Sequence, residues 1–248
     1  MTLKSSVKLE DPSNVEGKEF LDAISVAWQE SGYLRSYWGR TIEKEENVVW
    51  VVGTYLGISR EVVKHAGRIE ANRVHLRIIE WSDVSNSAPT GCLTPFFEPG
   101  TQPMSFHVTL TPPLTTDKDA LTSAPVTELV VLPFQDTISP EEKTALDNDL
   151  ITFRNTLLDI KSVKAPQSFS MGWIGRPGPV PHKESPSGGA LLTAVVVGWG
   201  SKEEHDTVRG TEEFGKAIKP ISERMLPGIE GLGMRHVRFK RDEKAKEE

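Results

Sequence analysis

The two halves of this sequence repeat the same succession of segments, at a spacing of roughly 130 residues. Each half has a glycine- and tryptophan-containing segment, then a β-branched apolar run, and closes on a strand-like segment with a central histidine. The matched segments are Ser36–Arg40 with Ser170–Arg176, Val48–Gly57 with Leu191–Ser201, and Ser105–Leu110 with Met234–Phe239. That spacing is too long for a solenoid repeat and fits one small domain per half.

The second half has the clearer pattern of helices and strands. The run Thr127–Phe134 predicts a strand, and Ser139 followed by Pro140 and two glutamates is typical of a helix start. Further strands are predicted at SFSMGWIG, at LLTAVVVGW and at GLGMRHVRF, with a helix from Ser201 through about Arg224 before the last of them. The order β-α-β-β-α-β is the ferredoxin-like pattern.

The first half fits this pattern less regularly. It predicts a weak strand at Leu3–Leu9, a helix at Glu16–Ser31, strands at Leu34–Ile42 and Asn47–Leu56, a helix opened by Ser59 and a last strand at Met104–Leu110. The segment VHLRIIEW (Val74–Trp81) is compatible with a strand or with a continuation of the second helix, and we favour the helix.

The two strongest predicted strands, VVWVVGTYL and LLTAVVVGW, carry apolar residues on both faces. Such a strand needs a partner layer on each side, whereas the helices of a ferredoxin-like unit cover only one face of its sheet. We therefore predict an α+β fold in which two tandem ferredoxin-like (βαββαβ) units pack sheet to sheet as an intrachain α/β barrel. The predicted divisions are a first unit at 1–112, a linker at 113–125, a second unit at 126–241 and a charged tail at 242–248.

Charge and composition narrow the classes of partner. The formal net charge of −6 gives nucleic-acid binding no electrostatic support. The single cysteine, Cys92, excludes an intrachain disulfide and a Cys-only metal site. No stretch approaches the roughly 20 apolar residues of a membrane span, and the N-terminus has no signal-peptide core. We expect a cytoplasmic protein, monomeric or homodimeric, that binds neither nucleic acid nor membrane.

The segments VTELVVLPF, SFSMGWIG, LLTAVVVGWGSKEEHD and GMRHVRF resemble the dimeric α/β-barrel superfamily. Within it, the chain is most similar to the fungal tandem-domain proteins of the antibiotic-biosynthesis-monooxygenase-like (ABM) group. The resemblance covers Val126–Arg241 well and Lys18–Leu110 weakly. It implies a cavity between each sheet and its partner, and relatives that include cofactor-free oxygenases of polycyclic aromatic substrates, haem-binding proteins and isomerases. Fold alone does not choose among these activities.

Two histidines stand at matching places in the last strands of the halves, His107 and His236. Facing a cavity, either could act as a general base or orient a substrate oxygen; facing elsewhere, each would be a buried or exposed structural histidine. A second pair, His65 and His205, lies early in the second helix of each half, where the resemblance would put a haem ligand. Both stand among charged residues, which is typical of a solvated helix face.

Aromatic and basic residues supply candidate contacts to a ligand. Stacking and apolar contact with a flat aromatic molecule are the functional interpretation, and ordinary core packing is the alternative. Arginines that follow the matched second strands could hold an anionic or phenolic oxygen at a cavity mouth, or could simply be solvated. The candidates are Trp38, Trp50, Tyr55, Trp173 and Trp199, with Arg40 and Arg176.

No phosphate-binding glycine loop, His-Glu metal motif or dinucleotide fingerprint is present, so no cofactor is implied. The leading hypothesis is a protein of the ABM type that binds or tailors a small apolar or aromatic molecule. The reaction class would be cofactor-independent oxygenation of an aromatic metabolite, with His107 or His236 taking a proton. The alternatives are a non-catalytic ligand-binding or structural barrel and a haem-binding relative.

Overall fold

The computed structural model of the chain describes residues 2–25, 33–55, 74–79, 93–100, 105–113 and 120–241. The strands are β1 (Tyr33–Thr41), β2 (Val48–Tyr55), β3 (Val74–Ile79), β4 (Ser105–Thr109), β5 (Val126–Gln135), β6 (Ser168–Arg176), β7 (Val180–Pro181), β8 (Gly189–Trp199) and β9 (Arg235–Arg241). The helices are α1 (Val15–Ser25), α3 (Ala120–Ser123), α4 (Pro140–Asp159), α5 (Lys202–Arg209) and α6 (Glu212–Ser222), with a 3-10 turn η3 (Thr94–Phe96). None of these described helices is long and apolar enough to span a membrane.

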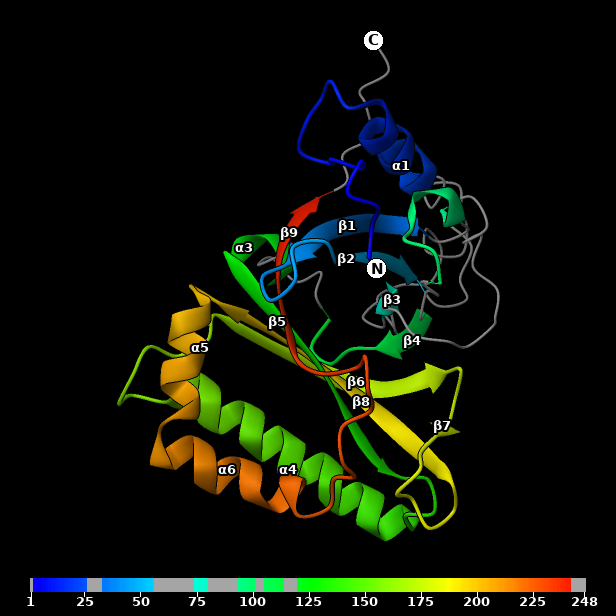
Figure 1. Cartoon of the computed structure of the whole chain (residues 1–248). Helices are drawn as coiled ribbons and strands as arrows, with labels where there is room; N and C mark the ends of the chain where they lie inside the picture. The colour runs from blue at the N-terminus through cyan, green and yellow to red at the C-terminus, as the bar shows by residue number, and fades with distance from the viewer. Residues whose placement is uncertain are drawn as a thin grey trace, which may run out of the picture.

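Eight strands close into an antiparallel barrel (Figure 1). The order around it is β5-β9-β1-β2-β3-β4-β6-β8, and β8 pairs again with β5 over ten residue pairs from Val126↔Trp199 to Gln135↔Ala190. The short β7 adds to the start of β8. A closed barrel leaves no long sheet edge open to another chain.

The barrel consists of two four-strand units, as the duplication predicted. The second half has the order β9-β5-β8-β6, which is the ferredoxin-like arrangement of a βαββαβ chain. The first half has the matching order β4-β3-β2-β1. The last strand of each half pairs with the far edge strand of the other half-sheet, β9 with β1 and β4 with β6. The predicted α+β fold of two tandem units in one intrachain barrel is therefore confirmed.

Two predicted elements of the first half are wrong. Val74–Ile79 is a strand and not a helix, because all of its residues pair with β2 and most of them also pair with β4. Leu3–Leu9 forms no strand: only Thr2 and Leu3 make isolated bridges. The apolar side chains of this segment pack on α1 instead, and β3 takes the position that a first strand would hold. The predicted second helix of this half lies outside the described residues.

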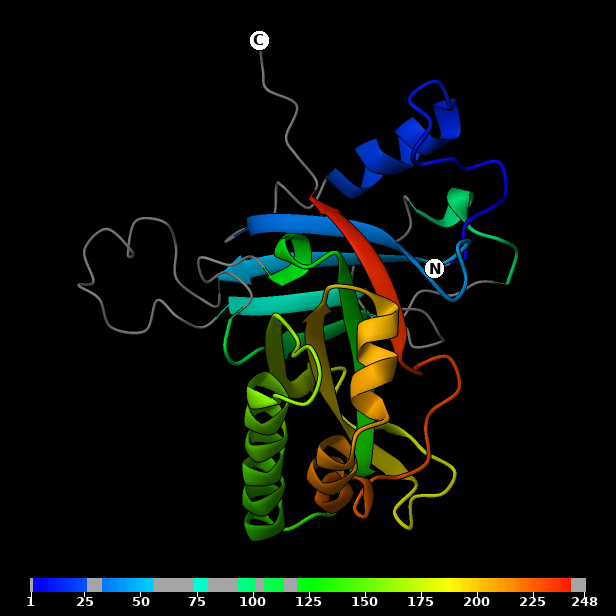
Figure 2. The ribbon, with the colours of Figure 1, turned by 90° about the vertical axis from the view of Figure 1, so that its left-hand side faces the viewer.

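The helices of the second half begin where capping residues predicted. Ser139 accepts from Glu142 N, and the Glu142 side chain accepts from Ser139 N, so α4 opens on a capping box. The helix predicted from Ser201 to Arg224 is in fact two helices. Helix α5 ends at its C-cap, Gly210, and Thr211 is the N-cap of α6. Figure 2 shows α4, α5 and α6 on the outside of the second half.

Three apolar clusters fill the layers. The first lies inside the barrel and joins both halves through residues such as Tyr37, Val51, Val108, Leu129, Val196 and Val237. The second packs α4 and α6 on the outer face of β5, β6 and β8. The third packs α1 and the N-terminal segment on the outer face of β1 and β2. The strands that were predicted to be apolar on both faces therefore do contribute to two clusters each.

Each seam between the halves contains a glycine against which the opposite strand packs closely. A Cβ on Gly39 of β1 would lie 2.3 Å from the carbonyl oxygen of Arg238 in β9. A Cβ on Gly172 of β6 would lie 2.1 Å from the carbonyl oxygen of Thr109, at the end of β4. Neither position has room for a side chain, so both seams depend on glycine.

Candidate functional site

A row of buried polar side chains crosses the outer face of the second half-sheet. Glu128 comes from β5, Trp199 from the end of β8 and His236 from the start of β9, at positions that alternate with residues of the interior cluster. His205 enters from α5, whose first turn is capped by Ser201. The exposed fraction is 7 % for Glu128 and 2 % or less for the other three site residues.

Short contacts connect this row to a carboxylate at the surface. Oε1 of Glu43, in the turn between β1 and β2, lies 2.5 Å from Nδ1 of His236, and Oε2 accepts from the backbone N–H of His236 at 3.0 Å. Nε2 of His236 lies 2.8 Å from Nδ1 of His205. Nε2 of His205 lies 3.5 Å from Oε2 of Glu128, which is longer than a hydrogen bond. The row therefore runs from the first half of the chain into the second.

Trp199 holds the buried end of the row. Its indole Nε1–H donates to Oε2 of Glu128 at 2.9 Å. Its ring centroid lies 4.9 Å from that of His205, with the two planes tilted by 32°. The indole thus fixes both the carboxyl and the imidazole beside it.

An apolar hollow of about 330 Å³ opens beside Glu128, between the sheet and helices α4 and α6. Glu128, Trp199, His205 and Arg209 supply its main polar groups. Most of the remaining wall is apolar and includes Phe153, Leu157, Phe169, Val197, Phe214 and Ile218. A cavity of this size, with apolar walls and a few convergent polar groups, is the common form of a small-molecule site.

Burial shifts the pKa values of the two groups at the hollow in opposite directions. It raises the pKa of Glu128 to about 7, although the hydrogen bond from Trp199 and the charge of Arg209 oppose the rise. It lowers the pKa of His205 to about 4, and the nearby His236 and Arg209 add to this effect. Both shifts favour a neutral carboxyl beside a neutral imidazole.

Glu43 differs from Glu128 in its charge state. Partial burial would raise its pKa, but hydrogen bonds from the side chain and the backbone N–H of His236 outweigh burial and lower the pKa. The side chain of Glu43 is 32 % exposed. One end of the row is therefore an ionised carboxylate in contact with water, and the other is a buried carboxyl.

This arrangement is suited to general acid–base chemistry. A carboxyl whose pKa lies near neutral pH can both accept and donate a proton under physiological conditions. Its position in the wall of an apolar hollow would bring it to any molecule bound there. Within the described residues, no group of three or more His, Cys, Asp or Glu side chains is arranged to hold a metal ion.

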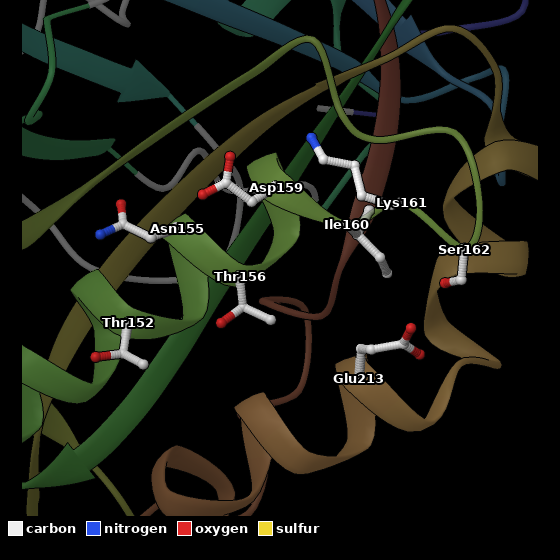
Figure 3. A pocket seen from close by; sticks show the side chains of 8 residues that line it. All are labelled: Thr152, Asn155, Thr156, Asp159, Ile160, Lys161, Ser162 and Glu213. Carbon is white, nitrogen blue, oxygen red and sulfur yellow. The ribbon is translucent and has the colours of Figure 1, made fainter.

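A second hollow, of about 560 Å³, lies between the C-terminal half of α4 and the start of α6 (Figure 3). Most of the residues around it are of polar types and include Thr152, Asn155, Thr156, Asp159 and Glu213. None of these side chains belongs to the buried row. This hollow is larger, but its lining contains neither the aromatic side chains nor the acid–base pair of the first hollow, so the first hollow is the candidate site.

The predicted catalytic histidines lie in different surroundings. His236 is fully buried within the row, but it stands behind His205 and does not line the hollow. His107 lies in β4 between the interior residues Phe106 and Val108, so its side chain points out of the barrel, across from Arg176 of β6. The structure therefore does not bring the two histidines together.

The predicted aromatic contacts divide in the same way. Trp199 lines the hollow. Trp173 packs under α4, where its Nε1–H donates to Oδ1 of Asp147 at 2.6 Å. Trp38 belongs to the outer cluster of the first half. Trp50 and Tyr55 lie in β2, but their side chains are outside the described part of the structure.

Neither predicted arginine reaches the hollow beside Glu128. Arg40 pairs with Glu10 at 3.0 Å and donates to the carbonyl oxygen of Glu45. Arg176 is exposed at the end of β6. The arginine that does line the hollow is Arg209, in α5.

Sequence reasoning missed three members of the row. The charged surroundings of His205 predicted a solvated face, and this was wrong, because the helix turns His205 inward while its charged neighbours stay outside. Glu128 lies within an apolar run and Glu43 within an acidic turn, and neither was predicted as a site residue. The signal for Glu128 was present: a lone carboxylate in a run of β-branched residues is rarely buried without a purpose. His65 lies outside the described residues.

Comparisons with known proteins are distant. No protein-family model and no curated protein matches the chain. A dimeric protein of unknown function and ferredoxin-like fold from Bacteroides fragilis is 15 % identical over 46 % of this chain and 93 % of its own, with a TM-score of 0.31. A candidate monooxygenase from Fusobacterium nucleatum is 9 % identical, with 94 % and 88 % covered and a TM-score of 0.45. An anthrone oxidase-like protein is 10 % identical, with 94 % and 89 % covered and a TM-score of 0.45.

Proposed function

We propose that the chain is a small-molecule tailoring enzyme of the ABM type, which oxygenates a flat aromatic substrate bound in the hollow beside Glu128. The observation that carries the proposal is the Glu128 carboxyl itself. It is buried, its pKa is raised to about 7, and it lies in the wall of an apolar cavity. Burying such a group costs stability, and carboxyls with raised pKa values are common where a site transfers protons. Removing a proton from an apolar substrate is the reaction that this group fits.

The substrate class follows from this chemistry. A methylene between two aromatic rings, activated by a carbonyl group as in anthrone, loses a proton to a carboxylate more readily than an ordinary hydrocarbon does. The aromatic wall of Phe153, Phe169 and Phe214 suits flat rings. Arg209 at the edge of the hollow offers a cation to the oxygen that becomes negative in the enolate.

The proposed step balances with molecular oxygen as the oxidant. Ionised Glu128 takes one proton from the methylene, and the resulting carbanion gives one electron to O₂. The radical pair combines into a C–O bond, and Glu128 returns its proton to the terminal peroxide oxygen. The hydroperoxide then loses its remaining C–H proton and hydroxide as one water molecule, which leaves a ketone. One oxygen atom ends in the product and the other in water.

In this proposal the predicted residues have altered roles. Glu128 takes the proton, in place of His107 or His236. Trp199 holds Glu128 and forms part of the wall. Trp38, Trp173, Arg40 and Arg176 have no part in the reaction, because their contacts lie elsewhere.

Oxygen uptake with anthrone tests the proposal. We expect wild-type protein to consume one O₂ per anthrone, and Glu128→Gln, which keeps the side-chain shape, to lose activity by at least about a hundredfold. Glu141→Gln, an exposed change in the first turn of α4, is the control and should match wild type.

Two further measurements separate the alternatives. If anthrone binds by calorimetry but neither wild type nor Glu128→Gln consumes oxygen, the chain is a non-catalytic binding protein and the enzymatic proposal fails. Titration with haem, followed by Soret absorbance, tests the haem-binding alternative. A shift that His205→Ala abolishes would favour haem binding over the proposed reaction.

A further inference from the structure

We propose that Glu128 exchanges its proton with solvent through a relay of His205 and His236 that ends at Glu43. The role of the relay in turnover rests on the proposed function; its existence does not. Because Glu43 comes from the β1–β2 turn, the relay would make the first half of the chain part of the candidate active site. The second half would then not be an independent catalytic unit.

The need for a relay comes from the burial of Glu128. To act as a base, the carboxyl must first lose its own proton, yet only 7 % of the residue is exposed. The apolar wall of the hollow offers that proton few acceptors, and a bound aromatic molecule would cover the hollow as well. A path through the protein avoids both obstacles.

The ring nitrogens are arranged to pass a proton in one direction. In the proposed relay both imidazoles are neutral, so ionised Glu43 accepts from Nδ1–H of His236 and Nε2 of that ring is left as an acceptor. Nε2 can then accept only from Nδ1–H of His205, 2.8 Å away. The remaining nitrogen of His205, Nε2, is therefore an acceptor and faces Glu128. With both imidazoles neutral, every donor in the row points toward Glu43.

A concerted shift along this row would move one proton from Glu128 to Glu43. The proton of Glu128 goes to Nε2 of His205, and Nδ1–H of His205 goes to Nε2 of His236. Nδ1–H of His236 then goes to the Glu43 carboxylate, which water can deprotonate. Each imidazole ends neutral in its other tautomer, so no buried charge is left on a ring. The 3.5 Å contact at Glu128 must close by a small rotation of that side chain.

The surrounding charges fit a neutral His205. Arg209 and Lys202 on α5 disfavour a proton held on the ring, whereas Asp206 favours it. Trp199 covers the ring from β8, and His236 meets it from β9. The net effect favours the neutral ring, so His205 would pass a proton on without remaining protonated.

Nitrogen NMR of the two imidazoles tests the relay without any substrate. In wild-type protein at pH 7 we expect both rings to be neutral and protonated on Nδ1. In Glu43→Gln the amide can donate as well as accept, so the tautomer of His236 should become mixed. Glu46→Gln removes the same charge from the same turn and should leave both rings as in wild type. Opposed tautomers, or a charged ring, in wild type would overturn the relay.

Kinetics with anthrone then test its role in turnover. Glu43→Gln should lower kcat about tenfold and leave KM unchanged, because the relay supplies only part of the rate factor of acid–base catalysis. The same substitution should enlarge the solvent isotope effect on kcat. Imidazole added to His236→Ala should restore part of the rate. Loss of activity in Glu128→Gln with wild-type rates in Glu43→Gln would overturn the relay alone. Inactive wild-type protein with aligned tautomers would overturn the proposed reaction and leave the relay standing.

Discussion

The indole of Trp199 donates to the carboxyl of Glu128 at 2.9 Å, although 71 residues separate them in the chain. The two residues stand two positions apart on the paired strands β5 and β8, since Val126 lies opposite Trp199. The hydrogen bond acts against the effect of burial on the pKa of Glu128. Trp199 therefore favours ionisation of the buried carboxyl, against the larger effect of burial.

Replacing the indole donor should make Glu128 a weaker acid. In Trp199→Phe we expect the pKa of Glu128 to rise above about 7, because the hydrogen bond that lowers it is lost. The free energy of unfolding should fall by roughly 1–2 kcal/mol, as for one buried hydrogen bond. Carbon NMR of the Glu side chains and urea denaturation measure the two effects. Trp173→Phe, whose donor faces Asp147, is the control and should leave the titration of Glu128 unchanged.

The pH dependence of stability should differ in sign between variants of the buried pair. The pKa of Glu128 is raised in the folded state, so its contribution is full below its ordinary value of 4.5 and is lost as pH rises through about 7. The pKa of His205 is lowered, so its contribution is full above its ordinary value of 6.5 and is lost as pH falls through about 4. Between these limits the two effects oppose each other in wild type.

Single substitutions should expose each effect. Glu128→Gln keeps only the histidine effect, so its stability should rise from pH 4 to pH 6.5. His205→Asn keeps only the carboxyl effect, so its stability should fall from pH 4.5 to pH 7. Urea denaturation across this range measures both slopes relative to wild type. Parallel curves for the two variants would contradict the opposite shifts.

Filling the hollow should block binding without unfolding the protein. Val130 lies in the wall of the hollow, two residues beyond Glu128 on β5. In Val130→Phe we expect the affinity for anthrone to fall at least about tenfold, which is about 1.4 kcal/mol. Calorimetry measures the affinity. Ile151→Phe adds similar bulk to the exposed side of α4 and should bind anthrone as wild type does.

The predictable parts of the fold were those with strong local signals. The cap at Ser139 and the apolar runs of β5 and β8 were nearly sufficient to predict the second unit. The first unit was less predictable, because Val74–Ile79 has a composition that suits a helix or a strand. Only its two neighbours, β2 and β4, decide for the strand, and such pairing is not visible in a local pattern.

The site was less predictable still, since it is assembled from distant segments. His236 was identified from its place in the repeat, but its partners Glu43 and His205 lie 193 and 31 residues away. The barrel closure that brings the β1–β2 turn onto β9 is a property of the whole fold. Burial is the main cause of the shifted pKa values of Glu128 and His205, and burial is not visible in the local sequence.

The glycines at the two seams should be essential for stability. In Gly39→Ala or Gly172→Ala the new Cβ meets a backbone carbonyl oxygen of the other half, at 2.3 Å or 2.1 Å, so the paired strands must separate. We expect each change to lower the free energy of unfolding by on the order of 2–4 kcal/mol. A Cβ on Gly175, in the same strand as Gly172, would lie 3.9 Å from the carbonyl oxygen of His107, so Gly175→Ala should be neutral. Urea denaturation compares the three. Wild-type stability in both seam variants would mean that the halves do not meet as closely as β9 on β1 and β4 on β6 require.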